Sequence, residues 1–257
     1  MREFFGFGGY TRTPEGAYSW QHLLFVFLTI LAMFGLAFLF GLKNRNRDEK
    51  EKNKVLIVSA IMIDAIEIFK IILLCFRSHD AMAWKTTLPL FLCSIQLITI
   101  PLAAFSKGRI KEAALDFVFV FGILGAIAGT IGAAQNYNAY PVLSFDNVVS
   151  AITHCISGFA SLYIVISDME SMKKENIPLL FMILGIFIVL AFIANYIIPY
   201  NYMFLRRDDG TPYIMITKLV NGNKVLYPIG VILLFVLYIF VFYCIYYLIT
   251  KKKAKNQ

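Results

Sequence analysis

The chain has 257 residues, of which 59% are hydrophobic and only 16% are charged. Soluble domains average about 45–50% apolar and about 25% charged residues, so the composition excludes an ordinary soluble protein and indicates one that crosses a membrane several times. The net charge of +8 does not indicate nucleic-acid binding, because the basic residues lie mainly in loops and the C-terminal tail, where they orient membrane proteins. The four cysteines lie in apolar stretches without CxxC spacing, so no disulfide framework, metal site or cofactor is expected.

Seven stretches are long and apolar enough for transmembrane helices. A helix that crosses about 30 Å of hydrocarbon needs roughly 20 apolar residues, and a lipid-exposed backbone must satisfy its own hydrogen bonds. The sequence therefore predicts an all-α, seven-helix bundle in a single membrane domain over residues 1–257. The expected spans are 22–42, 55–76, 86–105, 112–134, 144–167, 177–198 and 226–250.

Lys and Arg are distributed unevenly between the two sets of loops. The loops 43–54, 106–111 and 168–176 and the tail 251–257 hold fifteen, whereas the N-terminus and the remaining loops hold eight. Cytoplasmic loops carry an excess of Lys and Arg. The distribution predicts a multi-pass plasma-membrane protein with its N-terminus outside and its C-terminus in the cytoplasm.

The third predicted span, LPLFLCSIQLITIPLAAF, contains two prolines, a cysteine and a glutamine. Pro89 stands near its start, where a missing N–H costs little, and Pro101 lies deep and is expected to kink the helix. Cys93 and Gln96 are three residues apart and share a helix face. This face is expected to look into the bundle.

Polar residues of several spans lie at similar depth when depth is taken from the helical rise. Ionisable residues inside a membrane are costly and are functional candidates by default. Cys93 and His154 differ in depth by only about 5 Å, whereas Asp116 lies near the cytoplasmic boundary and is expected to be a solvated acid at a helix start. The layer in the outer half of the membrane contains Cys93, His154, His22, Asp64, Glu67, Lys70, Gln96 and Asn195.

Four stretches in order, LPLFLCSIQLITIPLAAF, FGILGAIAGT, ITHCISGFASLYIVI and NYMFL, resemble YwaF-type bacterial integral membrane proteins over roughly Tyr18 to Leu248. A related eukaryotic group of cysteine-dependent acyltransferases, which remodel phospholipids, is similar in the cysteine-bearing helix. The resemblance implies matches for Cys93 in the LPLxLC element, for His154 in the TH element and for residues 201–205. Bacterial relatives usually read LPLHLC, and this chain has Phe91 in place of that histidine.

These residues favour a thiol mechanism in which Cys93 is the nucleophile and His154 the general base. Burial alone would leave a thiol inert, so Lys70 is expected to supply a positive field, and Gln96 or Asn195 a donor to an oxyanion. The expected partners are membrane lipids, with a phospholipid as substrate. The residues expected to bind it are His22, Glu67, Lys70, Gln96, Asn195, Asn201 and Tyr202.

Structural alternatives stand beside each assignment. Cys93 is also compatible with a small buried hydrophobe, His154 with an interhelical hydrogen bond, and Glu67 and Lys70 with an ion pair on one helix face. The glycines of FGILGAIAGT form a GxxxG helix-packing face.

Two other functions also stay open. A small-solute transporter would use the charged residues of the second span as a relay, although the chain shows no internal repeat. A non-catalytic head-group receptor would bind a lipid without turnover.

Overall fold

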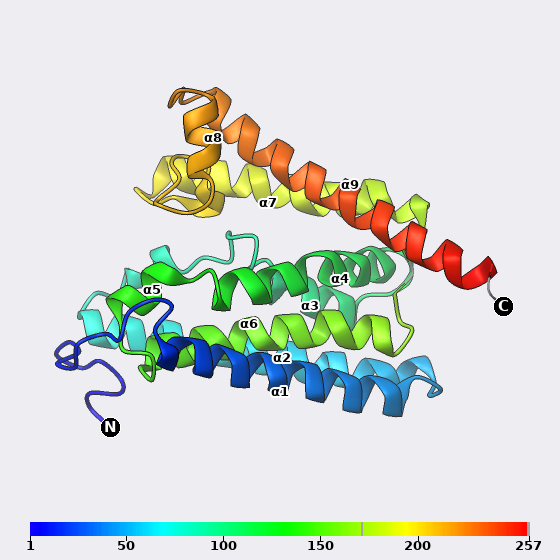
Figure 1. Cartoon of the computed structure of the whole chain (residues 1–257), viewed down its shortest axis with the longest axis horizontal. Coiled ribbons are helices and arrows are strands. Elements are labelled where there is room, and N and C mark those ends of the chain that lie inside the picture. The colour runs from blue at the N-terminus through cyan, green and yellow to red at the C-terminus, as the bar shows by residue number, and fades with distance from the viewer. Residues whose placement is uncertain (171, 256–257) are drawn as a thin grey trace. The chain divides into compact units, whose positions relative to one another are not determined.

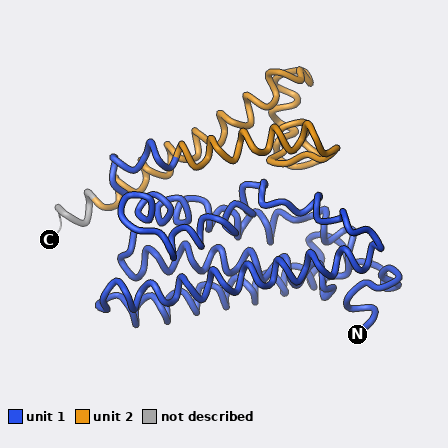
Figure 2. Tube along the Cα trace, turned by 180° about the vertical axis from the view of Figure 1, so that it is seen from behind, with its two compact units in different colours: residues 1–180 blue, residues 181–257 orange. Residues whose placement is uncertain are grey.

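The computed structural model describes residues 1–170 and 172–255, and for residues 251–255 it describes the backbone alone. All regular secondary structure in these residues is helical (Figure 1). The chain divides into two compact units, Met1–Leu180 and Phe181–Gln257 (Figure 2). Helix α7 (Ile177–Ile197) runs from the first unit into the second.

The first unit is organised around helix α6 (Phe145–Ile166), which packs against α4, α1 and α2. The long helices around it are α1 (Trp20–Asn44), α2 (Glu49–Ser78) and α4 (Gly108–Thr130). The short elements are η1 (Ala83–Thr86), α3 (Gln96–Phe105), α5 (Ala134–Ala139) and η2 (Lys174–Asn176).

Side-chain caps define where three of the long helices begin. Ser19 accepts a hydrogen bond from the backbone N–H of His22 at the start of α1, and Asp48 and Ser144 do the same for α2 and α6. Such caps satisfy N–H groups that have no partner within the helix. These boundaries are therefore set locally by the sequence.

Five helical segments of the described residues are long and apolar enough to cross a membrane. The protein is therefore an all-helical, multi-pass membrane protein. The segments are Trp20–Asn44, Gly108–Ala139, Phe145–Ile166, Lys174–Ile197 and Leu226–Thr250. The count of seven spans and the orientation of the termini stay predictions.

The prediction of one continuous helix over 86–105 is wrong in its first half. Residues 87–91 are irregular, residues 92–95 form a turn, and only Gln96–Phe105 is α-helical. Pro89 disfavours helical geometry in Leu88, and the Ser94 hydroxyl engages the backbone of Phe91, accepting from its N–H at 2.9 Å and donating to its carbonyl at 3.1 Å. This local bonding competes with a helix. Cys93 consequently lies on irregular backbone directly before α3.

The second unit contains the remainder of α7, η3 (Tyr202–Phe204), α8 (Ile214–Leu219) and α9 (Leu226–Lys255). Helix α8 packs against α9, and Ile216 reaches the backbone at Gly230. An apolar sequence such as that of α9 suits a helix that faces lipid.

Asp116 is not the solvated acid that the sequence predicts. Its carboxylate is fully buried and accepts hydrogen bonds from the Met172 backbone N–H at 2.9 Å and from the Asn176 side chain at 3.2 Å. The loop after α6 folds back over the start of α4, so Asp116 fastens this loop instead of facing water.

Glu170, in the same loop, predicts a pH-dependent stability. Burial raises the pKa of Glu170 from 4.5 to about 7, and one carboxylate oxygen has no hydrogen-bond partner among the described residues. The folded state therefore holds this proton more tightly than the unfolded state, so stability falls as pH rises from about 4.5 to about 7 and stays low above it. We expect Glu170→Gln to raise the free energy of unfolding by roughly 1–2 kcal/mol at about pH 8, after allowance for partial exposure, and to change it little at about pH 4.

Thermal unfolding of the purified protein as a function of pH measures this difference. Glu175→Gln is the matched control, because Glu175 lies nearby but is exposed. A gain from Glu170→Gln that is the same at every pH would contradict the prediction.

Candidate functional site

The thiol of Cys93 lies beside the imidazole of His154, close enough for the two groups to interact. Cys93 lies in the turns before α3, and His154 lies on α6, so the contact joins two separate elements of the first unit. The backbone N–H of Ser94 lies beside the Cys93 sulfur. Both side chains are partly buried. A thiol in this arrangement can pass its proton to the ring and keep a stabilised sulfur anion.

The other ring nitrogen of His154 is anchored on its own helix. Nδ1 lies 2.7 Å from the backbone carbonyl of Ser150. A carbonyl only accepts hydrogen bonds, so Nδ1 carries the proton and Nε2 of the neutral ring is left as an acceptor. This tautomer suits a general base for the thiol.

Helix α4 contacts the same pair. Gly125 lies against Cys93, and Gly129 lies against His154. The sequence interpretation of these glycines as a helix-packing face missed the contact with the pair. The available signal was their four-residue spacing, which places them on one helix face, in a span adjacent in sequence to the one that carries Cys93.

A cavity of about 190 Å³ lies between the last turns of α2 and the start of α6, and neither Cys93 nor His154 is among its lining residues. Ser150 lines this cavity, and its carbonyl is the group that holds His154. The polar lining includes Lys70, Arg77, Asn136, Tyr140, Asp146 and Ser150. Small polar groups thus have a space that extends to the residue that anchors His154.

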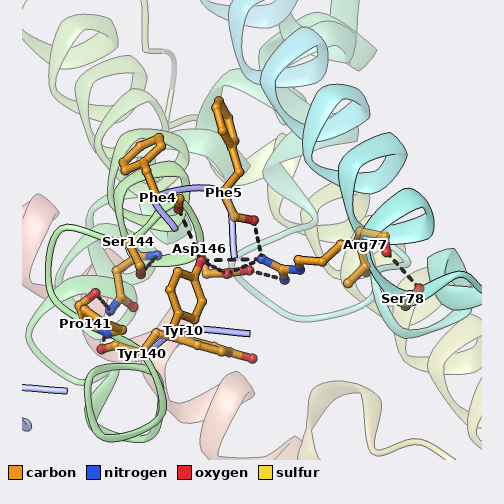
Figure 3. Close-up of polar contacts among 11 residues, drawn as sticks. Phe4, Phe5, Tyr10, Arg77, Ser78, Tyr140, Pro141, Ser144 and Asp146 are labelled. Carbon is orange, nitrogen blue, oxygen red and sulfur yellow. Dashed lines mark hydrogen bonds and ion pairs between the residues drawn. The ribbon is translucent and has the colours of Figure 1, made fainter. Parts of the chain in front are cut away.

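Arg77 and Asp146, which were not predicted from the sequence, both line this cavity and form an ion pair (Figure 3). The Arg77 guanidinium donates to both carboxylate oxygens, at 2.6 and 2.8 Å, a bidentate geometry that adds strength and direction. Tyr10 donates to the same carboxylate at 2.5 Å, and Arg77 donates to the Phe5 carbonyl at 3.2 Å. Burial, and then the bond to Asp146, raise the pKa of Tyr10 to about 12. These contacts fasten the N-terminal segment to α2 and α6.

Glu67 and Lys70 form an ion pair with an N···O distance of 2.5 Å, which is the structural alternative considered for them. Glu67 is buried, whereas Lys70 is partly exposed and lines the cavity. Lys70 lies near enough to His154 for its charge to act on the ring. Lys70 thus borders the Cys93–His154 site, and Glu67 is paired with it.

Gln96 is fully buried and begins α3, three residues after Cys93. Its side-chain oxygen accepts from the Thr99 hydroxyl at 3.0 Å, which fixes the direction of the amide. The amide nitrogen has no hydrogen-bond partner in the described part of the chain. A buried donor without a partner costs about 1–3 kcal/mol, and such groups in native structures call for an explanation.

His22 lies in a different cluster from Cys93 and His154. The ring is fully buried and stacks on Tyr137 with centroids 3.8 Å apart. Nδ1 accepts from the Tyr18 backbone N–H at 2.9 Å, and Nε2 lies 3.4 Å from the Thr130 carbonyl. Both nitrogens are occupied, so the ring has none left for the substrate that the sequence assigned to it. His22 fastens the start of α1 to the end of α4.

The three remaining predicted residues belong to the second unit and organise its own loop. The Asn195 side chain bonds both backbone groups of Tyr202, at 2.7 and 3.0 Å. Asn201 donates to Asp209 at 2.7 Å and accepts from the Arg206 backbone N–H at 2.9 Å. These amides hold the turn after α7, and Tyr202 is fully buried within it. The NYMFL element therefore has a clear structural use.

Comparison with models of protein families matches residues 17–246 with the TMEM164 family. The matched range contains Cys93, His154 and the glycines of α4. No curated protein and no solved structure matches the chain.

Proposed function

Because the chain belongs to the TMEM164 family, a family of membrane proteins, we propose that it is a thiol-dependent acyltransferase acting on phospholipids within the membrane. The observation that carries the proposal is the position of the Cys93 thiol beside the His154 imidazole, with both residues packed on the same glycine face of α4. The proposed nucleophile thus lies next to its proposed base, and the ring of that base is oriented by a third group, the Ser150 carbonyl. This arrangement is the signature of an activated nucleophile.

In the first step, the Cys93 sulfur attacks the carbonyl carbon of a lipid ester while its proton passes to Nε2 of His154. The bond between the carbonyl carbon and the glycerol oxygen then breaks. The leaving oxygen takes the proton from His154, which releases a lysophospholipid and leaves an acyl thioester on Cys93.

In the second step, the hydroxyl of an acceptor lysophospholipid loses its proton to Nε2 and attacks the thioester carbonyl. The carbon–sulfur bond breaks, the sulfur regains the proton from His154, and a new phospholipid is released. Water in place of the acceptor hydroxyl would yield a free fatty acid, and the same site would then be a hydrolase.

The negative charge that develops on the carbonyl oxygen needs donors that are already in place. Ser94 offers its backbone N–H beside the sulfur, and Gln96 offers the buried amide that has no partner in the described residues. We therefore assign Gln96 to this oxyanion.

Gln96→Met is expected to lower the rate of acyl transfer about a hundredfold and to leave the protein at least as stable, because it removes an unsatisfied buried donor while roughly keeping the volume. Single-turnover rates and thermal unfolding measure the two effects. A loss of stability together with unchanged rates would show that Gln96 serves packing alone.

The finer features of the proposal come from the resemblance to YwaF-type bacterial proteins and their eukaryotic relatives. We propose that the substrates are in the outer leaflet of the plasma membrane, with the N-terminus outside. Phe91 replaces the histidine of LPLHLC, so the chemistry here must proceed with His154 alone. The position of His154 beside Cys93 supports that view.

The direct test uses purified protein in vesicles that contain a phospholipid with a labelled acyl chain and an unlabelled lysophospholipid. We expect label in the acceptor lipid and a hydroxylamine-sensitive acyl group on the protein. Label released as free fatty acid would indicate a hydrolase. If the lipids stay unchanged and no thioester forms, the enzymatic proposal is wrong, and solute transport or head-group binding takes its place.

A further inference from the structure

Two glycines of α4 contact the two members of the Cys93–His154 pair. A Cβ atom built on Gly125 would lie 3.3 Å from the Cβ of Cys93. One built on Gly129 would overlap Cδ2 and Nε2 of His154, well inside the 3.0 Å that real Cβ atoms keep from their neighbours. The imidazole therefore lies directly over the bare backbone of Gly129, and the crowded nitrogen is the one left to face the thiol.

The two contacts are one helical turn apart on one rigid element. Four residues of an α-helix span about 6 Å, so Gly125 and Gly129 offer two fixed contact points. Cys93 lies on irregular turns and His154 on α6, so neither element alone determines how far the sulfur is from the ring. Helix α4 is the support that both share.

We propose that the glycine face of α4 sets the distance between thiol and imidazole, and that Gly129 and Gly125 are positioning residues for the pair. The role in catalysis rests on the proposed function, whereas the geometric role does not. Any side chain at residue 129 must displace the His154 ring from its present position beside the thiol. A side chain at residue 125 would require Cys93 to shift by only a few tenths of an ångström.

Gly122, on the same face of α4, offers a matched control. A Cβ there would lie 2.7 Å from the Ser157 carbonyl and 2.7 Å from the Ser161 Cβ. Gly122→Ala therefore introduces a severe clash between α4 and α6, at a position that touches neither Cys93 nor His154. Gly35→Ala on α1 is the second control, since nothing described lies within 4 Å of its Cβ position.

The test measures the rate at which Cys93 is alkylated as a function of pH. It uses full-length protein in which the other cysteines, at positions 75, 155 and 244, are replaced by serine. A coupled thiol–imidazole pair titrates in two steps that belong to the pair, whereas an isolated thiol gives one step at about pH 8.5. His154→Ala defines the isolated profile.

We expect Gly129→Ala to give the single-step profile of His154→Ala, and Gly125→Ala a profile between the two. Gly122→Ala should lower the melting temperature yet keep the two-step profile, and Gly35→Ala should change neither. A two-step profile in Gly129→Ala, or its loss in Gly122→Ala, would overturn the proposal.

If Gly129→Ala does not fold, Gly125→Ala decides in its place, and an unshifted profile there overturns the proposal. Alkylation does not depend on turnover. If the glycine variants change the pH profile of alkylation but the protein transfers no acyl group, the proposed function is wrong and the positioning role stands. If the protein transfers acyl groups but the glycine variants leave the profile unchanged, the positioning role is wrong and the proposed function stands.

Discussion

Cys93→Ala is expected to abolish both the acyl thioester and the movement of labelled acyl chains between lipids. The sulfur is the atom that bonds the acyl group in the proposed mechanism, and this substitution removes it. Gel analysis of the labelled protein and mass spectrometry of the lipids measure the two products.

Cys155→Ala is the control for this loss. Cys155 is also partly buried and lies next to His154 in sequence, but its thiol donates to the Thr29 carbonyl at 3.6 Å. Its replacement should leave the rate of acyl transfer unchanged. Equal loss in both variants would point to damage of the fold, and full activity in Cys93→Ala would exclude Cys93 as nucleophile.

His154→Gln is expected to lower the single-turnover rate of thioester formation by about 10²–10⁴-fold, the usual contribution of a positioned general base. The thiol should also lose its two-step titration, since its partner no longer ionises. The combination separates a base from a residue that merely fills space, because packing alone does not create a second titration step.

His22→Gln provides a matched histidine control. His22 is more deeply buried than His154, and its nitrogens bond backbone groups of the chain. Its replacement should lower the free energy of unfolding by about 1–3 kcal/mol and leave the rate per folded molecule unchanged. Should the two variants instead lose rate in parallel, the assignment of His154 as base would be wrong.

Glu67→Gln separates the enzymatic proposal from transport. Glu67 pairs with Lys70 outside the thiol–imidazole contact, so the Glu67→Gln variant should still catalyse acyl transfer. A solute transporter would show the opposite pattern, with Glu67 essential and Cys93 dispensable.

The helical, multi-pass architecture could be predicted from local features of the chain. Long apolar stretches and caps such as Ser19 and Ser144 act within a few residues of where they stand, so the all-helical, multi-pass architecture follows from them. The expectation that Cys93 and His154 lie at similar depth assumed a constant helical rise, which does not apply to Cys93 because it lies before the start of α3.

Which of these side chains meet could not be predicted in the same way. Depth leaves the rotation and the neighbours of each helix undetermined, and these depend on how all helices of a unit pack together. In the packed structure Cys93 lies beside His154, whereas His22 belongs to a separate cluster. Arg77 and Asp146, which are distant in the sequence, form an ion pair. The contact between Gly129 and His154 has the same origin, because the close approach of a ring to a bare backbone exists only once α6 lies against α4.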